Sequence, residues 1–185
     1  DDVVVSHADL DHAGGAESLL KLWPVARVFS SEAVATLRHI VTTPCIAPTR
    51  WHYDGVDFEV LHPHADEHNA PRNDSSCVLR VSGPHGRLLL AGDIELGAEH
   101  ALLARQAQAL AAEILSVPHH GSSSSSSEAF VRAVQPRLAL IAAGRHNRYH
   151  LPQAEVVARY ESAGARVMNS AGLGAISVEV LANGM

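Results

Sequence analysis

The sequence predicts a layered α/β fold formed by a single domain. At 185 residues the chain is long enough for one compact unit with a sizeable core and too short for two. Predicted strands first lie close together in the sequence and then alternate with helical segments, a pattern that favours strands covered by helices. Clusters of His and Asp follow the ends of several of these strands, which is where α/β proteins build their sites.

Local patterns place the individual elements. Short runs rich in apolar and β-branched residues predict strands at 2–5, 26–30, 58–61, 77–81, 87–91, 114–117 and 138–142, near Val167 and at 176–181. Helical spacing and end signals predict helices at 15–22, 31–40, 95–110, 128–134 and 153–163. Prolines and Trp51 predict an irregular segment at 41–54, and Gly83 and Gly86 turn the chain before the strand at 87–91.

Composition narrows the classes of function. The formal charge is −6, from 14 Lys and Arg against 20 Asp and Glu, which argues against a broad basic surface for nucleic acid. The longest apolar runs are too short to cross a bilayer, and the chain opens on acidic residues rather than a secretory signal, so a soluble piece is expected. Cys45 and Cys77 lie in unlike contexts, and the sequence predicts neither a disulfide scaffold nor a redox compartment from them.

The densest group of chemically active residues is His7, Asp9, Asp11 and His12. It lies between an apolar strand and a helix and is followed by Gly14-Gly15, which allow a close backbone approach. Imidazole and carboxylate together suit Zn, Mn or Fe. The alternative is a solvated turn that caps the next helix.

Asp93 ends another apolar strand, where a carboxylate is costly to bury unless it is paired or bound to a cation. Its alternative role is the N-cap of the helix that starts near Glu95. His119 and His120 follow the strand at 114–117; because adjacent side chains point in different directions, one could bind metal while the other acts as an acid or meets the substrate. A chance pair in a loop is the alternative for them.

Two further loops carry candidate substrate-binding groups. The serines at 122–127 either bind an anionic oxygen, with help from backbone N–H groups, or form a mobile loop. The loop after the strand at 138–142 contains Arg145, Arg148 and His150, whose local positive charge suits a phosphate. A polar loop leading to a helix start at Pro152 is its alternative.

These four clusters, in this order, resemble the metallo-β-lactamase superfamily. Its signature is His-x-His-x-Asp-His after a strand, an Asp after a later strand, and a His at the end of another. His7, Asp11 and His12 match the signature, and Asp9 stands where a second His is usual. The runs SHADLDHAGG, LLLAGD and VPHHGSSSSS, with the later run 145–152, are similar to the C-terminal domain of ComEC-type DNA internalisation proteins of bacterial competence. The likeness extends from Val3 to about Val180.

The resemblance implies a metallo-β-lactamase-like αββα sandwich with a two-metal centre at one edge. Members usually have further strands before the one at 2–5, so the sandwich is expected to be N-terminally truncated, a soluble fragment of a larger protein. In the resembled family that protein is an inner-membrane channel. The resemblance therefore implies a place beside the channel domain, on the non-cytoplasmic (periplasmic) face of the inner membrane.

Carried over by position, the resemblance assigns two divalent ions, Zn or Mn. His7 and Asp9 serve one ion, Asp11, His12 and one of the pair His119 and His120 serve the other, and Asp93 bridges them. Another His usually completes the first site, and here Asn73 or Asp74 stands in its place. An oxygen-rich first site makes Mn credible beside Zn.

The implied function is a metal-dependent phosphodiesterase, a nuclease that degrades one DNA strand during uptake, with an activated hydroxide attacking phosphorus. The expected catalytic residues are Asp11, His119, His120 and His150, and the expected substrate-binding residues are Asn73, Ser122, Arg145, Arg148 and His150. Single-stranded DNA is the expected partner. The alternatives are a hydrolase of a small-molecule ester or phosphodiester, which the negative charge favours, and a catalytically degenerate structural module of the uptake channel.

Overall fold

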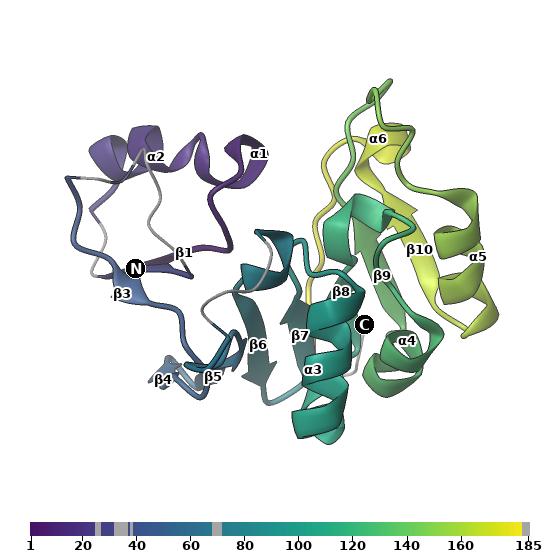
Figure 1. The fold of residues 1–185 in the computed structure, drawn as a ribbon, viewed down its shortest axis with the longest axis horizontal. Coiled ribbons are helices and arrows are strands. Elements are labelled where there is room, and N and C mark those ends of the chain that lie inside the picture. Colours follow the sequence, from purple (N-terminus) through teal and green to yellow (C-terminus); the bar gives the residue numbers. More distant parts are fainter. Residues whose placement is uncertain (25–26, 32–36, 38, 68–71, 183–185) are drawn as a thin grey trace.

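A computed structural model describes the chain except residues 25–26, 32–36, 38, 68–71 and 183–185 (Figure 1). The strands of the described part are β1 (Asp2–Val5), β2 (Arg27–Ser30), β3 (Thr43–Pro44), β4 (Arg50–Tyr53), β5 (Val56–His62), β6 (Val78–Gly83), β7 (Gly86–Leu90), β8 (Ile114–Ser116), β9 (Leu138–Ile141) and β10 (Arg166–Asn169). Its α-helices are α1 (Leu10–Ala13), α2 (Ala16–Leu22), α3 (Leu96–Gln106), α4 (Glu128–Val134), α5 (Ala154–Ser162) and α6 (Ser170–Leu173). Its 3-10 helices are η2 (Asn73–Ser75), η3 (Ala107–Leu110) and η4 (Pro118–Gly121).

The described strands form two sheets. A three-stranded parallel sheet has the order β1-β2-β3, and a seven-stranded mixed sheet has the order β10-β9-β8-β7-β6-β5-β4. In the larger sheet, β4 to β7 pair antiparallel in sequence order, whereas β7 to β10 pair parallel and are connected through helices. The antiparallel half and the parallel half meet at β7, and Asp93 follows the end of this strand.

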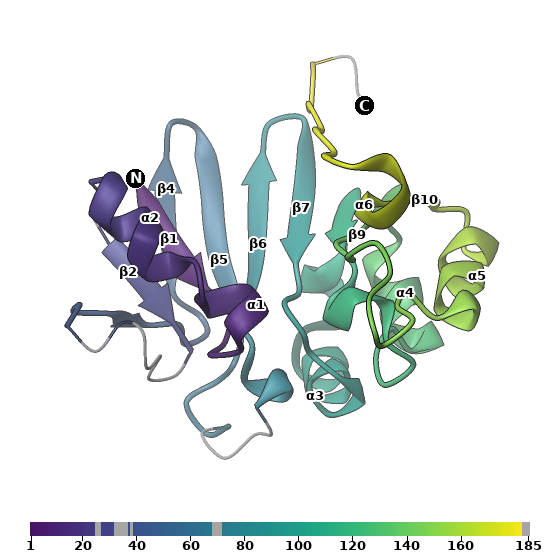
Figure 2. The same ribbon diagram turned by 90° about the horizontal axis from the view of Figure 1, so that it is seen from above.

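Apolar side chains divide the molecule into layers. Helices α1 and α2 cover the small sheet, through Ala13 and Ala16 packed with Val5 and Val28. Helices α3, α4 and α5 lie on the large sheet (Figures 1 and 2) and bury the main core. Its largest side chains, each at most 1% exposed, are Leu61, Leu89, Ile94, Leu102, Leu110, Leu115, Phe130, Ile141 and Tyr160. A third apolar group fills the space between the two sheets, which gives the expected order of helix, sheet, sheet and helix.

Three predicted segments differ from the structure or lie outside its description. The segment 41–54, predicted to be irregular, contains the strand β4, which pairs with β5 through a turn at Asp54 and Gly55. Both turn residues have positive φ, 48° and 80°, which suits a tight hairpin. No strand forms at 176–181, where the only assignment is a single bridge position at Leu181. Most of the predicted helix at 31–40 lies outside the described residues.

A disulfide between Cys45 and Cys77 corrects the expectation drawn from their unlike contexts. Their Cα atoms are 6.0 Å apart, and the two residues are 32 positions apart in the sequence. Cys45 follows β3 of the small sheet and Cys77 precedes β6 of the large one, and both are buried between the sheets. The pairing depends on how the two sheets stack, which local sequence does not reveal.

Reduction of this disulfide is expected to lower the free energy of unfolding by about 3 to 4 kcal/mol, because the bridge closes a loop of some thirty residues. Urea unfolding with and without a reducing agent measures the difference. The Cys45→Ala/Cys77→Ala variant is the control, because its unfolding midpoint should not respond to the reductant. Two alkylatable thiols in the denatured, unreduced protein would contradict the bridge.

Candidate metal centre

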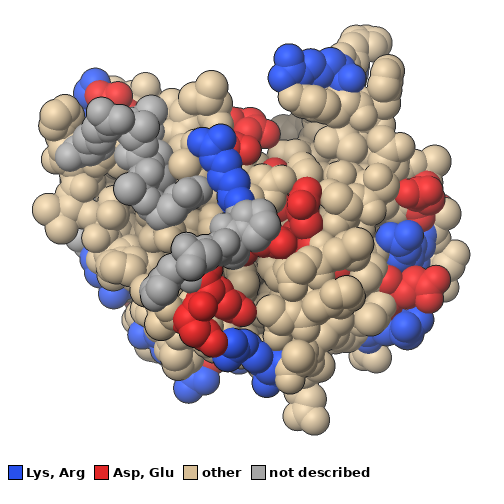
Figure 3. All heavy atoms as spheres, in the orientation of Figure 1, with Lys and Arg blue, Asp and Glu red and all other residues tan. Residues whose placement is uncertain are grey.

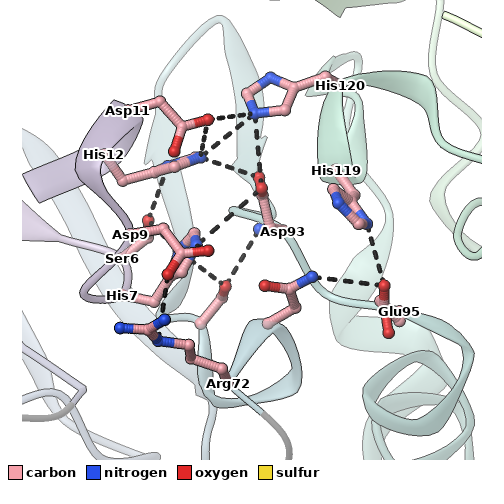
Figure 4. A network of polar contacts seen from close by, with 12 residues as sticks. Ser6, His7, Asp9, Asp11, His12, Arg72, Asp93, Glu95, His119 and His120 are labelled. Atoms are coloured by element: carbon pink, nitrogen blue, oxygen red, sulfur yellow. Dashed lines mark hydrogen bonds and ion pairs between the residues drawn. The ribbon is translucent and has the colours of Figure 1, made fainter. Parts of the chain in front are cut away.

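Three strand ends, from both sheets, bring the predicted ligands together (Figure 4). The chain leaves β1 at Ser6 and His7 and turns at once into α1, which presents Asp11 and His12. Asp93 follows β7, and the tight turn η4 after β8 carries the histidine pair. Gly92 allows this approach: its φ is +58°, and a Cβ there would meet the Cβ of Ser76 at 2.8 Å.

Four side chains form the centre of the site, namely Asp11, His12, Asp93 and His120, whose ligand atoms all lie within 4.8 Å of one another. The Nε2 of His12 is 3.1 Å from Oδ1 of Asp93. The Nε2 of His120 is 3.2 Å from Oδ2 of Asp11 and 3.4 Å from Oδ2 of Asp93. Two imidazoles and two carboxylates from the segments that follow three strands therefore face one point, which is a donor set suited to a Zn or Mn ion.

Hydrogen bonds orient both imidazoles for coordination. The Nδ1–H of His120 donates to the carbonyl oxygen of Ala142 at 2.6 Å, and because a carbonyl only accepts, the lone pair of the neutral ring lies on Nε2. The Nδ1 of His12 lies 3.1 Å from the hydroxyl of Ser6. The two Nε2 atoms, 3.3 Å apart, point toward each other (Figure 4). Such an arrangement fits a shared cation between them.

The charges of the centre are strongly coupled. Burial opposes ionisation of Asp93, but hydrogen bonds from His12 and His120 outweigh it and hold the pKa of Asp93 far below its usual value. The hydrogen bond to Asp93 raises the pKa of His120 to about 9. Asp93 is thus a buried anion that needs a positive partner, and a bound cation would take the place of the imidazolium proton.

His7 and Asp9 form a second group of donors beside this centre. His7 is 0% exposed, and its Nε2 has no hydrogen-bond partner among the described residues. This atom lies 3.7 Å from Oδ2 of Asp9 and 4.0 Å from Oδ2 of Asp93. Burial lowers the pKa of His7, which keeps the ring neutral, as a metal ligand must be. Because Oδ2 of Asp93 faces both His7 and His120, Asp93 occupies the bridging position between the two groups.

Asn73 and Asp74, one of which was expected to join His7 and Asp9 at the first metal ion, have other partners in the structure. The side chain of Asn73 donates to Oε1 of Glu95 at 3.3 Å. Asp74 is buried, and its carboxylate accepts the backbone N–H of Glu95 at 2.6 Å, which stabilises the start of α3. Asp74, rather than Asp93, therefore accepts this N–H at the start of α3. The carboxylate of Asp93 contacts the histidines instead. Arg72, whose Nε lies 3.1 Å from Oδ1 of Asp9, is the cation nearest to this group among the described side chains.

The structure separates the adjacent histidines. His119 and His120 both have left-handed backbones, with φ of 47° and 53°, a costly conformation that clusters at functional sites. The turn directs His120 into the centre, whereas the Nδ1 of His119 lies 3.1 Å from Oε1 of Glu95 and 3.2 Å from Oγ of Ser124 (Figure 4). Of the two rings, only that of His120 therefore belongs to the central group of four side chains.

The serine run is held in place by a buried carboxylate. The backbone N–H groups of Ser126 and Ser127 donate to Glu99, whose pKa burial raises. Ser127 also caps α4, since its hydroxyl accepts the N–H of Phe130. These N–H groups are therefore already used, and of the run only Ser122 lines the cavity in front of the centre.

That cavity has a volume of about 710 Å³. It is lined by Asp9, Leu10, Asp11, Asp93, His119, His120, Ser122, Arg148, Tyr149, Leu151 and Gln153. Arg145 and His150 are exposed on the same loop but do not line it, and Nε of Arg145 donates to the carbonyl of Ala171. In Figure 3, acidic side chains gather in the hollow between the two halves of the molecule, and a basic patch covers the projecting loop after β9.

Sequence reasoning missed the residues that orient the ligands. Ser76 contacts His7 through its hydroxyl and accepts the backbone N–H of Asp93 at 3.0 Å. Ser6 contacts both His7 and His12, and Glu95 contacts His119. Serine and glutamate are common at strand and helix ends, so no signal in one sequence sets these three apart.

Comparison with known proteins identifies the family. The family model described as "Metallo-beta-lactamase superfamily" matches residues 1–145. The chain belongs to this superfamily. The metallo-beta-lactamase fold protein YhfI from Bacillus subtilis superposes with a TM-score of 0.56, over 91% of this chain and 73% of that one, at 11% identity. The predicted fold class is thereby confirmed.

Several curated proteins are similar to this metallo-β-lactamase chain over nearly its whole length. "Competence protein ComA" of Neisseria gonorrhoeae is 35% identical over 92% of the chain, and "Recombination protein 2" of Haemophilus influenzae is 34% identical over 95%. "ComE operon protein 3" of Bacillus subtilis is 32% identical over 92%. The expected resemblance to ComEC-type competence proteins is confirmed.

The chain spans less than a quarter of the length of these relatives, between 22% and 24%. Within the described residues, no helix has the length and apolar character needed to cross a bilayer.

Proposed function

We propose that this metallo-β-lactamase domain is a metal-dependent phosphodiesterase that degrades one strand of DNA during its uptake. The observation that carries the proposal is the group of Asp11, His12, Asp93 and His120, of which Asp11, Asp93 and His120 line the cavity. Relatives named for competence and recombination make DNA the favoured substrate. Similarity to these relatives, and the polar lining of the cavity, support hydrolysis of a phosphodiester bond more than of an amide or thioester bond.

Two ions are proposed, one held by Asp11, His12, Asp93 and His120 and one by His7, Asp9 and Asp93. A divalent cation at these donors supplies Lewis acidity toward the phosphate and a water that is nucleophilic near neutral pH. Asp93 belongs to both donor sets, because its Oδ1 faces His12 and its Oδ2 faces His7 and His120. The group of His7, Asp9 and Asp93 is rich in oxygen donors, with Asp9 in place of a His, and suits Mn as well as Zn.

The remaining cavity residues are assigned to the substrate. Arg148 and Ser122 donate hydrogen bonds to phosphate oxygens, since both line the cavity. His119, held at Nδ1 by Glu95, keeps its Nε2 for the departing oxygen and donates a proton to it. Arg145 and His150 add positive charge and a hydrogen-bonding group on the outer side of the same loop, where the DNA backbone continues.

The disulfide supports a location outside the cytoplasm. Disulfides persist in oxidising compartments such as the bacterial periplasm and are rare in the cytosol. A buried bridge between Cys45 and Cys77 therefore fits the periplasmic face of the inner membrane, beside the channel domain of a parent protein.

A hydrolase of small phosphodiesters is the second candidate, favoured by the net charge of −6 and by the acidic hollow around the centre. Cleavage of a labelled single-stranded oligonucleotide with Mn, beside bis(4-nitrophenyl) phosphate, separates the two. The proposal expects both to be cleaved and the oligonucleotide to have the higher kcat/KM. Cleavage of the small ester alone would favour the second candidate, and cleavage of neither, in protein loaded with Mn or Zn, would contradict both.

A further inference from the structure

The loop between β9 and α5 is fixed by its own hydrogen bonds. The side chain of Asn147 donates to the carbonyls of Gly144 and Leu151, at 3.0 and 2.7 Å, and accepts the N–H of Leu151 at 2.9 Å. Pro152 packs against Gly121, whose φ is +82° and where a Cβ would come within 2.6 Å of the Cβ of Pro152. The loop is thus tied directly to the turn that carries the two histidines.

This fixed loop presents an aromatic ring to solvent. Tyr149 is 61% exposed, although its neighbours in the loop are held in place. The guanidinium of Arg148 lies 4.7 Å from the centre of its ring and donates to its hydroxyl. Exposure of an apolar ring to water is unfavourable. Here the ring is paired with the Arg148 cation on one side and is not packed into the core.

The ring belongs to the same cavity as the metal ligands. Tyr149, Arg148 and Leu10 line the same cavity as Asp11, Asp93 and His120. Leu10 is 81% exposed, so two side chains with apolar surface, one from α1 and one from the loop after β9, line the same cavity as the charged groups. A volume of about 710 Å³ is within the range of a small-molecule site.

We propose that Tyr149, with Leu10 in the lining of the same cavity, is a base-stacking subsite that receives one unpaired nucleobase next to the phosphate held at the centre. The inference rests on the proposed function and specifies its substrate. An aromatic ring offers the same stacking face to any base, whereas Arg148 beside it takes the phosphate that follows the base. Only an unstacked base can enter, so single strands and frayed ends are selected over duplex.

The test is a binding measurement that needs no turnover. Fluorescence anisotropy, with Ca²⁺ as the cation, compares a labelled oligothymidylate with an abasic oligomer of the same length and the same number of phosphates. The wild-type chain should bind the thymidylate roughly 5- to 150-fold more tightly, the range for a single stacked base. Tyr149→Ala should remove most of this difference, and Tyr149→Phe should keep it.

Tyr53→Ala is the matched control, because Tyr53 is 55% exposed on β4 and does not line the cavity. It should bind both oligomers as the wild type does. Equal binding of the two oligomers by the wild type, or an unchanged ratio in Tyr149→Ala, would overturn the subsite. Hydrolysis of bis(4-nitrophenyl) phosphate by the wild type is measured separately. Its absence would count against the proposed function, whereas the binding ratio alone decides the subsite.

Discussion

Replacing Asp93 with Asn is expected to reduce hydrolysis of both DNA and small phosphodiesters by about 10³-fold or more. Asp93 is buried and faces His12, His120 and His7 with its two oxygens. The neutral amide keeps the shape of the side chain but removes the negative charge that both donor groups share. Loss of a bridging ligand removes several kcal/mol of stabilisation from the transition state, which corresponds to a rate loss of this size. Initial rates with saturating Mn measure the effect.

The variant must be shown to fold before its rates are interpreted. Circular dichroism and urea unfolding of the metal-free proteins provide this comparison, since the carbonyl oxygen of the introduced amide can still accept hydrogen bonds from the N–H donors around it. A folded Asp93→Asn variant that retains more than a tenth of the wild-type rate would contradict the bridging role of Asp93.

Alanine substitutions at the two adjacent histidines are expected to give different defects. His120→Ala should lose bound metal and activity together, because His120 is directed into the centre by its hydrogen bond to Ala142. His119→Ala should keep its metal content and lose about 10²- to 10⁴-fold in kcat, the range for removal of a general acid. Metal analysis and steady-state kinetics on the same preparations separate the two residues.

Glu95 extends this comparison. Since Glu95 holds the Nδ1 of His119, Glu95→Gln should resemble a weaker form of His119→Ala, with metal retained. If His119→Ala lost its metal and His120→Ala kept it, the assignment of the pair would be reversed.

The sequence predicted most of the elements that position the site. The apolar run before His7, the strand before Asp93 and the strand before His119 all form, as β1, β7 and β8. Local patterns were sufficient for these elements because each is a short, largely apolar run followed by polar residues. The residues expected at the centre also come from these three strand ends. The order of the motifs along the chain was therefore enough to predict which side chains lie close together.

Features that depend on stacking of the two sheets could not be predicted in the same way. The bridge between Cys45 and Cys77, and the contact of Ser76 with His7, join segments that meet only once the small sheet packs on the large one. The short strands β3 and β4 were missed because Pro44, Pro48 and Trp51 indicated an irregular segment at 41–54. Which member of the histidine pair faces Asp93 follows from two left-handed backbone conformations, which the sequence does not display.

The most direct test of the metal centre is the metal content of the purified chain. Elemental analysis compares the wild type with an Asp11→Ala/Asp93→Ala variant after both have been supplied with Mn or Zn and freed of loosely bound ions. About two ions per chain in the wild type, and a loss of both in the variant, is the predicted result. A wild-type chain that holds no more metal than the variant would contradict a metal centre at these three strand ends.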